Sequence, residues 1–156
     1  MADKIKDSDI SFDMIFGPAY KGILLGSILA TKLNKPVCFN RKEEKDHGEG
    51  GSLIGAEPEG RVLIVDDVIS SGLAIREVLE ILKPYDVEIA GVLVTLDRQE
   101  KGQKSDLMAS AELKSEGIDV FEIISLDGLL DADNIISEDD IVRIKDYREQ
   151  FRGKDA

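Results

Sequence analysis

A short run of acidic and small polar residues, from Asp66 to Gly72, has the composition of a site for a sugar phosphate. Ser70, Ser71 and Gly72 carry little side-chain bulk, so their backbone N–H groups can approach an anion closely, and a helix that begins near Gly72 would add a favourable dipole. Asp66 and Asp67 would repel that anion, but each can accept a hydrogen bond from a ribose hydroxyl. A phosphate beside a ribose diol is the outline of a 5-phosphoribosyl group.

Positive charge is concentrated in a second segment of the chain. Four basic residues fall within seven positions of a chain whose formal net charge is −12: Arg41, Lys42, Lys45 and the only histidine, His47. The surrounding residues 40–60 include five glycines and show no sustained hydrophobic period. This pattern predicts a long mobile loop at about 41–52, with a short hairpin as a candidate flank. The alternative for an arbitrary charged run is a solvated surface loop.

Two other motifs place a charged side chain next to a predicted strand. The run from Phe16 to Gly22 is a Gly/Pro turn whose small residues free backbone amides, and its lysine, Lys21, could lie beside a highly charged group. The run from Leu96 to Glu100 contains Arg98, whose guanidinium could pair with a carboxylate through two hydrogen bonds. Taken alone, the first motif could be only a tight Gly/Pro turn with a surface lysine. The second could be only a strand end with a surface arginine.

Short apolar runs alternate along the chain with stretches of helical period, which is typical of a parallel α/β sheet. Gly117 is a candidate helix C-cap, and Ser137 with Asp140 forms a capping-box signal. The predicted strands are Asp13–Phe16, Pro36–Asn40, Arg61–Val65, Glu88–Leu96 and Val120–Ile124. The predicted helices are Gly22–Leu33, Gly72–Lys83, Ser105–Glu116 and Glu138 to about Phe151. The acid pair therefore follows a strand, at the sheet edge where ligands bind in open α/β folds.

Length and composition fit one domain over residues 1–156, with 42% hydrophobic and 33% charged residues. The negative net charge argues against nucleic-acid binding, which needs basic surface. The apolar stretches are too short for a membrane span, and the first residues lack the apolar region of a secretion signal. The only cysteine, Cys38, excludes an intrachain disulfide and favours the reducing cytoplasm; we expect it in a buried strand.

The run from Val62 to Ala74 resembles the phosphoribosyl-pyrophosphate (PRPP) signature of type I phosphoribosyltransferases, because a hydrophobic strand, paired acids and a Ser/Gly loop coincide. The turn after Phe16 is similar to the pyrophosphate loop of the orotate-using members. The segment from Phe39 to Gly51 is similar to their mobile catalytic loop, and Arg98 matches an arginine that contacts the base. The resemblance covers most of the chain, from Phe12 to about Phe151.

The resemblance implies transfer of the phosphoribosyl group from PRPP to orotate in pyrimidine biosynthesis, giving orotidine 5′-monophosphate and pyrophosphate, with Mg²⁺ carried by PRPP. The residues that it implies for PRPP binding are Tyr20, Lys21, Arg41, Lys42, Lys45, His47, Asp66, Asp67, Val68, Ile69, Ser70, Ser71, Gly72, Leu73 and Ala74. Those with implied catalytic roles are Arg41, Lys45, His47, Asp66 and Asp67. Those with implied orotate contacts are Ser70 and Arg98.

The resemblance also implies an architecture. We expect the type I phosphoribosyltransferase fold, with a mostly parallel central sheet flanked by helices, and a homodimer whose catalytic loops close over the neighbouring subunit's site. Family members carry an N-terminal segment that forms a hood over the base. Nothing before Phe12 matches it, and Met1 to Ile5 looks like the tail of a helix. We therefore expect the hood to be missing and orotate binding to be affected more than PRPP binding.

Three alternatives remain open at this point. A phosphoribosyltransferase for another base would carry the same PRPP run, as would a PRPP-binding regulator without catalytic activity. A response-regulator receiver also has an acid pair after an apolar strand, but there the pair ends the first strand, whereas Asp66 and Asp67 follow two earlier strand candidates. The basic loop favours an enzyme, because it has no role in the regulator or the receiver.

Overall fold

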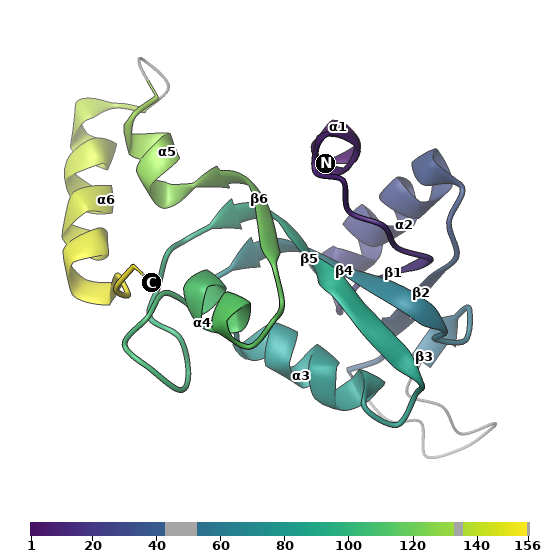
Figure 1. The fold of residues 1–156 in the computed structure, drawn as a ribbon. Helices are drawn as coiled ribbons and strands as arrows, with labels where there is room; N and C mark the ends of the chain where they lie inside the picture. Colours follow the sequence, from purple (N-terminus) through teal and green to yellow (C-terminus); the bar gives the residue numbers. More distant parts are fainter. Residues whose placement is uncertain (43–52, 133–135, 156) are drawn as a thin grey trace.

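The computed structural model describes residues 1–42, 53–132 and 136–155. Their strands form a six-stranded sheet in the order β3-β2-β1-β4-β5-β6 (Figure 1). All neighbours pair in parallel except β3, which runs antiparallel to β2. The strands are β1 (Met14–Phe16), β2 (Val37–Asn40), β3 (Leu53–Gly55), β4 (Gly60–Ile69), β5 (Val87–Asp97) and β6 (Val120–Ser125). The prediction of a mostly parallel α/β sheet is confirmed.

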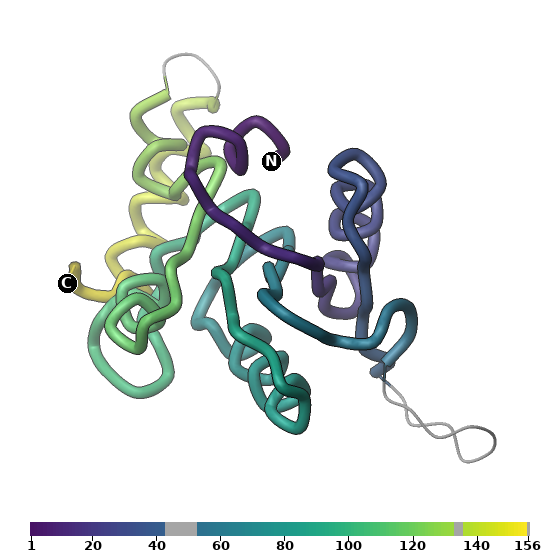
Figure 2. Tube along the Cα trace, turned by 45° about the vertical axis from the view of Figure 1, so that its right-hand side comes forward, coloured from purple at the N-terminus to yellow at the C-terminus, as the bar shows by residue number. Residues whose placement is uncertain are grey.

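Helices cover both faces of this sheet. One face packs against α1 and α2, and the opposite face packs against α3 and α4 (Figure 2). Two more helices, α5 and α6, lie together beyond the carboxyl end of β5 (Figure 1). The helices are α1 (Ala2–Asp7), α2 (Lys21–Leu33), α3 (Leu73–Leu82), α4 (Ala109–Ser115), α5 (Leu126–Leu130) and α6 (Glu138–Phe151).

Successive residues of the central strands belong to different layers of the core. Every second residue along these strands points to the layer formed with α3 and α4, namely Met14, Phe16, Val62, Ile64, Val92 and Val94. Their neighbours pack with α1 and α2, namely Ile15, Leu63, Val65 and Leu93. Because both faces are covered by helices, the buried stretches of these strands, Met14–Phe16, Val62–Val65 and Val92–Val94, are continuously apolar, as is usual for parallel sheets. Cys38 of β2 is also fully buried, as predicted, and burial raises the pKa of its thiol to about 11.

Several predicted boundaries were wrong. Strand β4 continues past Val65 to Ile69 because Asp66, Val68 and Ile69 pair with β5. The third predicted helix begins at Ala109 rather than Ser105, because the residues before it bend to meet a buried carboxylate. Helix α5 was not predicted from the sequence. The helical start of the chain was anticipated, and β3 completes the candidate hairpin with β2.

The predicted helix ends are largely confirmed. Gly117 follows α4 with a φ of 88°, and its amide donates to the carbonyl of Lys114 at 2.9 Å. The Ser137 hydroxyl accepts a hydrogen bond from the Asp140 amide at the start of α6. The expected reciprocal bond was wrong, because the Asp140 carboxylate accepts from the Ser137 hydroxyl and not from a backbone N–H. Within the described ranges, none of the helices has the length and apolarity needed to span a bilayer.

Candidate active site

The strand order of the sheet reverses between β1 and β4. The chain passes from β1 through α2 to β2 on one side, and β4 then pairs with the other side of β1. Loops that leave neighbouring strands in opposite directions open a crevice, and ligands of open α/β folds bind there. The two loops at this point are the turn after Phe16 and the bend from Ser70 to Gly72. The fold therefore brings the two predicted phosphate-binding motifs to one sheet edge.

The turn after β1 is held tightly against β4. A Cβ atom at Gly22 would lie 2.7 Å from the carbonyl oxygen of Val65 and 2.6 Å from Cδ of Pro18, so only glycine fits at the start of α2 without a backbone shift. The amide of Ala19 donates to Oδ1 of Asn40 at 2.9 Å, which ties the turn to the end of β2. The next peptide bond, between Ala19 and Tyr20, is cis.

A direct ion pair joins the two motifs. Nζ of Lys21 lies 2.7 Å from Oδ2 of Asp67, and the hydrogen bond and charge of Asp67 raise the pKa of this lysine. Lysine and carboxylate thus stand side by side where the resemblance implies a pyrophosphate next to a ribose diol. The pair holds the lysine near the crevice, and a bound diphosphate could share its ammonium.

The acid pair differs in environment between its two members. The backbone N–H of Asp67 donates to Oδ1 of Asp66 at 2.8 Å. Burial raises the pKa of the Asp66 carboxyl to about 6, against the opposing effect of that hydrogen bond. At neutral pH the Asp66 side chain is therefore mainly a carboxylate, which accepts hydrogen bonds from hydroxyl groups and does not donate them.

The bend after β4 leads directly into a helix of ten residues, α3. Gly72 is its N-cap residue, with a φ of 78° that favours glycine, and no side chain caps the first turn. The first N–H groups of α3 are therefore left for water or an anion. Ser70 and Ser71 are half-buried beside them. This geometry suits a monophosphate.

The predicted base contact, Arg98, follows β5 beside this bend. Its backbone N–H donates to the carbonyl of Ile69 at 3.0 Å, which places it next to Ser70 in the neighbouring strand end. Its Nη2 lies 2.8 Å from Oε1 of Glu100 and also donates to the Tyr147 hydroxyl. The two predicted orotate contacts are thus neighbours, and the guanidinium is already engaged within the chain.

The basic segment is only partly described. Arg41 and Lys42 line a pocket of about 290 Å³ together with Tyr20, Phe39 and Ile54. Nζ of Lys42 lies 5.3 Å from the centroid of the Tyr20 ring, within range of a cation–π contact. Lys45 and His47, and most of the loop predicted at 41–52, lie outside the described residues.

Sequence reasoning missed several residues that border the site. Asn40 fixes the turn after β1, Glu100 and Tyr147 contact Arg98, and the Gln103 side chain reaches the Ser71 carbonyl at 3.5 Å. An amide at a strand end gives a weak signal for Asn40. Nothing local marks Tyr147, because its partner is 49 positions away.

Comparisons with known proteins agree with this geometry. A family model described as a phosphoribosyl transferase domain matches residues 1–125. The chain is 48% identical over 160 residues to the orotate phosphoribosyltransferase of Stutzerimonas stutzeri (strain A1501), and 49% identical over 158 residues to that of Laribacter hongkongensis (strain HLHK9). Each alignment covers 96% of this chain and 74% of the relative. The crystal structure of the Francisella tularensis orotate phosphoribosyltransferase matches with a TM-score of 0.75 and 34% identity, over 97% of this chain and 76% of that one.

Proposed function

This chain belongs to the phosphoribosyltransferase family, and from that premise we propose that the crevice between β1 and β4 is the site where PRPP reacts with orotate. The chain is an orotate phosphoribosyltransferase, a pentosyltransferase of pyrimidine biosynthesis. The function rests on identity of 44–49% to orotate enzymes across 96% of the chain. That likeness favours orotate over another base, and an enzyme over a regulator or a receiver.

In the proposed complex, PRPP spans both loops of the crevice. The 5-phosphate lies at the bend from Ser70 to Gly72 and at the start of α3, where uncapped N–H groups and the helix dipole favour an anion. Asp66 and Asp67 accept hydrogen bonds from the ribose hydroxyls. Lys21 pairs with the pyrophosphate. Its Nζ already lies 2.7 Å from Oδ2 of Asp67, so in this proposal only its side chain has to rotate.

The proposed chemistry depends on positioning and on charge. As pyrophosphate leaves, C1 of the ribose gains positive charge, and the two carboxylates below it favour that charge. Lys21, Arg41 and Lys42 offset the charge of the departing group, together with Lys45 and His47, which the resemblance assigns to the same task. Orotate attacks C1 from the side of Ser70 and Arg98. Holding both reactants in one crevice lowers the entropic part of the barrier.

Mg²⁺ is part of this proposal as an ion that arrives with PRPP. No side chain is proposed as its direct ligand; the carboxylates of Asp66 and Asp67 are hard, negatively charged oxygen groups, and such groups would favour an Mg²⁺ ion that PRPP carries into the site. When bound, it would neutralise charge on the leaving pyrophosphate. The chain's own groups would still bind the ribose and the phosphate.

A homodimer is proposed from an apolar stripe on α2. Tyr20, Leu24 and Ile28 are spaced four residues apart and are 65%, 69% and 68% exposed. Residues with this spacing share one face of a helix, and an exposed apolar face of this kind marks an interaction surface. The stripe begins at the pyrophosphate turn and adjoins the pocket lined by Arg41 and Lys42. A second copy docked here would lie next to the basic segment, as shared active sites require.

Two expectations from composition also stay proposals. The net charge of −12 disfavours a nucleic-acid partner. A cytoplasmic location fits a chain whose only cysteine, Cys38, is free and buried.

The test is a base-competition assay. Purified chain is mixed with PRPP and Mg²⁺, and pyrophosphate release is followed with orotate, uracil or adenine as the only base. We expect release with orotate and orotate depletion at the same rate. Release with adenine or uracil alone would assign another base, and PRPP binding without release for any base would assign a regulator.

A further inference from the structure

Arg98 is held in a three-membered cluster that joins the end of β5 to α6. Its Nη2 lies 2.8 Å from Oε1 of Glu100, and the same nitrogen donates to the Tyr147 hydroxyl. That hydroxyl in turn donates to Oε1 of Glu100. The guanidinium carbon also lies 5.0 Å from the centroid of the Tyr147 ring. Every member of the cluster therefore contacts the other two.

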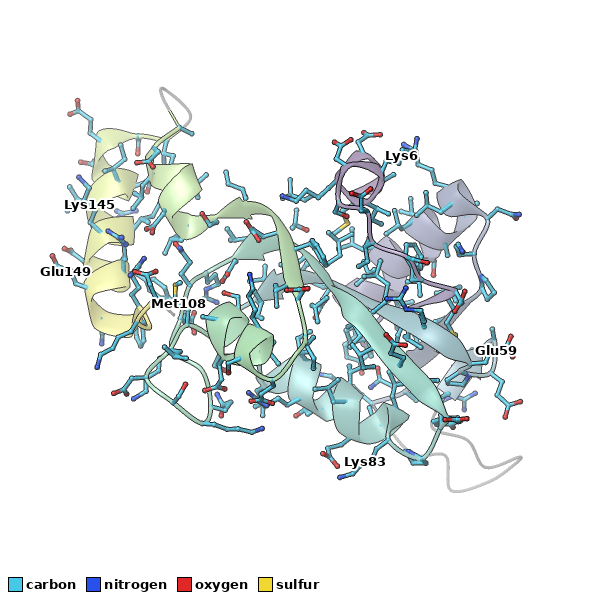
Figure 3. The ribbon with its side chains drawn as sticks, in the orientation of Figure 1. Lys6, Glu59, Lys83, Met108, Lys145 and Glu149 are labelled. Atoms are coloured by element: carbon cyan, nitrogen blue, oxygen red, sulfur yellow. The ribbon has the colours of Figure 1, made fainter. Side chains whose placement is uncertain are left out.

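Helix α6 is fastened to the residues around Arg98 at further points. The amide of Lys101 donates to the carbonyl of Phe151 at 3.0 Å. Asp127 accepts from Arg152 at 3.1 Å and from the Gln99 side chain at 3.2 Å, and its own amide donates to Oε1 of Gln99 at 2.8 Å. Lys145 and Glu149 extend from the side of α6 that faces away from the sheet, whereas Tyr147 is half-buried (Figure 3). The helix thus presents Tyr147 to Arg98 on a rigid support.

We propose that Tyr147, with Glu100, is a positioning residue that sets Arg98 for orotate, an inference that rests on the proposed function. The cluster occupies Nη2 of Arg98 and leaves Nε and Nη1 without hydrogen bonds to described residues, so these can donate to the substrate. An arginine side chain that is ordered in advance loses less conformational entropy when it binds. The family model ends at residue 125, so this role falls on a helix outside the matched region.

The protonation of the cluster suits this role. Burial, and then the neighbouring Glu100, raise the pKa of the Tyr147 hydroxyl above its ordinary value, so it stays a neutral donor to Glu100 at neutral pH. The carboxylate of Glu100 is 16% exposed and has the tyrosine hydroxyl and the arginine as partners. Because Arg98 and the tyrosine hydroxyl both contact this carboxylate, they offset its negative charge, and Glu100 repels an anionic base less.

The competing explanation is that Tyr147 only anchors α6. Its ring packs on Phe151 with centroids 4.7 Å apart, and this packing does not need the hydroxyl. Tyr147→Phe keeps the ring and removes only the bonds to Arg98 and Glu100. Tyr85→Phe is the matched control, because it makes the same chemical change at a tyrosine whose hydroxyl has no bond to a described residue, in the turn between α3 and β5.

The experiment measures KM for orotate and for PRPP separately, in the wild type, Tyr147→Phe, Tyr85→Phe, Arg98→Ala and the Arg98→Ala/Tyr147→Phe double variant. For Tyr147→Phe we expect KM for orotate to rise roughly threefold to tenfold, the range for the net contribution of one ordinary hydrogen bond, with kcat and KM for PRPP within about twofold. In the Arg98→Ala background the same substitution should have no further effect, because it acts through Arg98.

Three results would overturn the inference on an active enzyme: an unchanged KM for orotate in Tyr147→Phe, an equal rise in KM for PRPP, or a full effect that persists without Arg98. A wild-type chain that forms no orotidine 5′-monophosphate would instead remove the proposed function, and this inference with it.

Discussion

Asp66 is half-buried in the last part of β4, next to the proposed ribose site, and its ionisation should control PRPP binding. Burial raises the pKa of its carboxyl from 3.8 to about 6. Because the folded-state pKa is raised, the contribution of Asp66 to stability is fully present below pH 3.8 and is lost as the pH rises through about 6. Its function runs the other way, because the carboxylate offers both oxygens as acceptors, to a ribose hydroxyl and to the Asp67 amide, whereas protonation turns one of them into a donor and removes the charge.

The first prediction is therefore a pH dependence of binding. Between pH 7.5 and pH 5.5, the affinity of the wild type for PRPP should fall by about threefold to fivefold more than that of Asp66→Asn, in proportion to the lost carboxylate. Isothermal titration calorimetry measures the affinity of both proteins at each pH. Protonation of PRPP itself affects both proteins equally and so drops out of the comparison. If the affinities of the two proteins changed with pH in the same way, Asp66 would not be a ligand of the ribose.

The second prediction concerns Lys45, whose role comes from the resemblance. Lys45→Ala should lower turnover by about 10²–10³, the scale for removing one group that stabilises the transition state, while PRPP binds almost as before. Lys83→Ala is the control, since Lys83 lies directly after α3 (Figure 3). Its side chain is 72% exposed and paired with Glu80. A loss below about twofold would mean that Lys45 is not catalytic.

Glu112 is the residue through which α4 holds α3 and the segment before it. Its side chain is 4% exposed, and one carboxylate receives the Arg76 guanidinium at 2.5 Å, the Ser105 hydroxyl at 2.6 Å and the amides of Gln103 and Lys104. Burial alone would raise the pKa of Glu112, but these bonds outweigh it and lower the pKa to about 2. Because Arg76 lies in the first turns of α3, the network supports the helix that starts at the bend from Ser70 to Gly72, the proposed phosphate site.

The third prediction is that Glu112→Ala lowers the free energy of unfolding by about 3–5 kcal/mol, because it leaves a half-buried guanidinium with one partner fewer. The contribution of Glu112 is present above pH 4.5 and is lost as the pH falls towards 2, so the wild type should lose its advantage in acid. Urea unfolding at several pH values checks both statements. Glu80→Ala, at an exposed ion pair, should lower the free energy of unfolding by less than about 1 kcal/mol. An equal loss in both variants would contradict the special contribution of Glu112 to stability.

The limits of sequence prediction follow from where each element's partners lie. The run from Val62 to Ala74 could be predicted because strand, acids, bend and helix are contiguous. The extension of β4 could not, because it depends on pairing with β5. The contact between Arg98 and Tyr147 spans 49 positions, and no local pattern specifies it. The roles of Lys45 and His47 remain predictions, since both lie outside the described residues.

At the scale of the whole molecule, the exposed stripe on α2 is the surface that a second copy would cover. Tyr20, at its start, belongs to the turn that we propose to bind pyrophosphate, so dimer formation and the active site would share one edge of the sheet. The stripe is apolar in a chain that is strongly acidic overall. This combination is typical of a protein–protein interface with a charged surround.

The fourth prediction is that Leu24→Glu makes the protein monomeric, because it places a charge in the middle of the apolar stripe. Sedimentation velocity should show a dimer for the wild type and a monomer for the variant. Val142→Glu is the matched control, since Val142 is an apolar residue of α6 that is 58% exposed and far from α2 in the chain. A monomeric wild type, or a dimer that Leu24→Glu leaves intact, would contradict the proposed interface.

The most direct measurement is a crystal structure of the chain with ribose 5-phosphate bound. We expect the phosphate within hydrogen-bonding distance of the backbone amides between Ser70 and Ala74, and the ribose 2- and 3-hydroxyls on the carboxylates of Asp66 and Asp67. Electron density for the ligand at another surface, or a crevice that stays empty at saturating ligand, would show that this sheet edge does not bind the phosphoribosyl group.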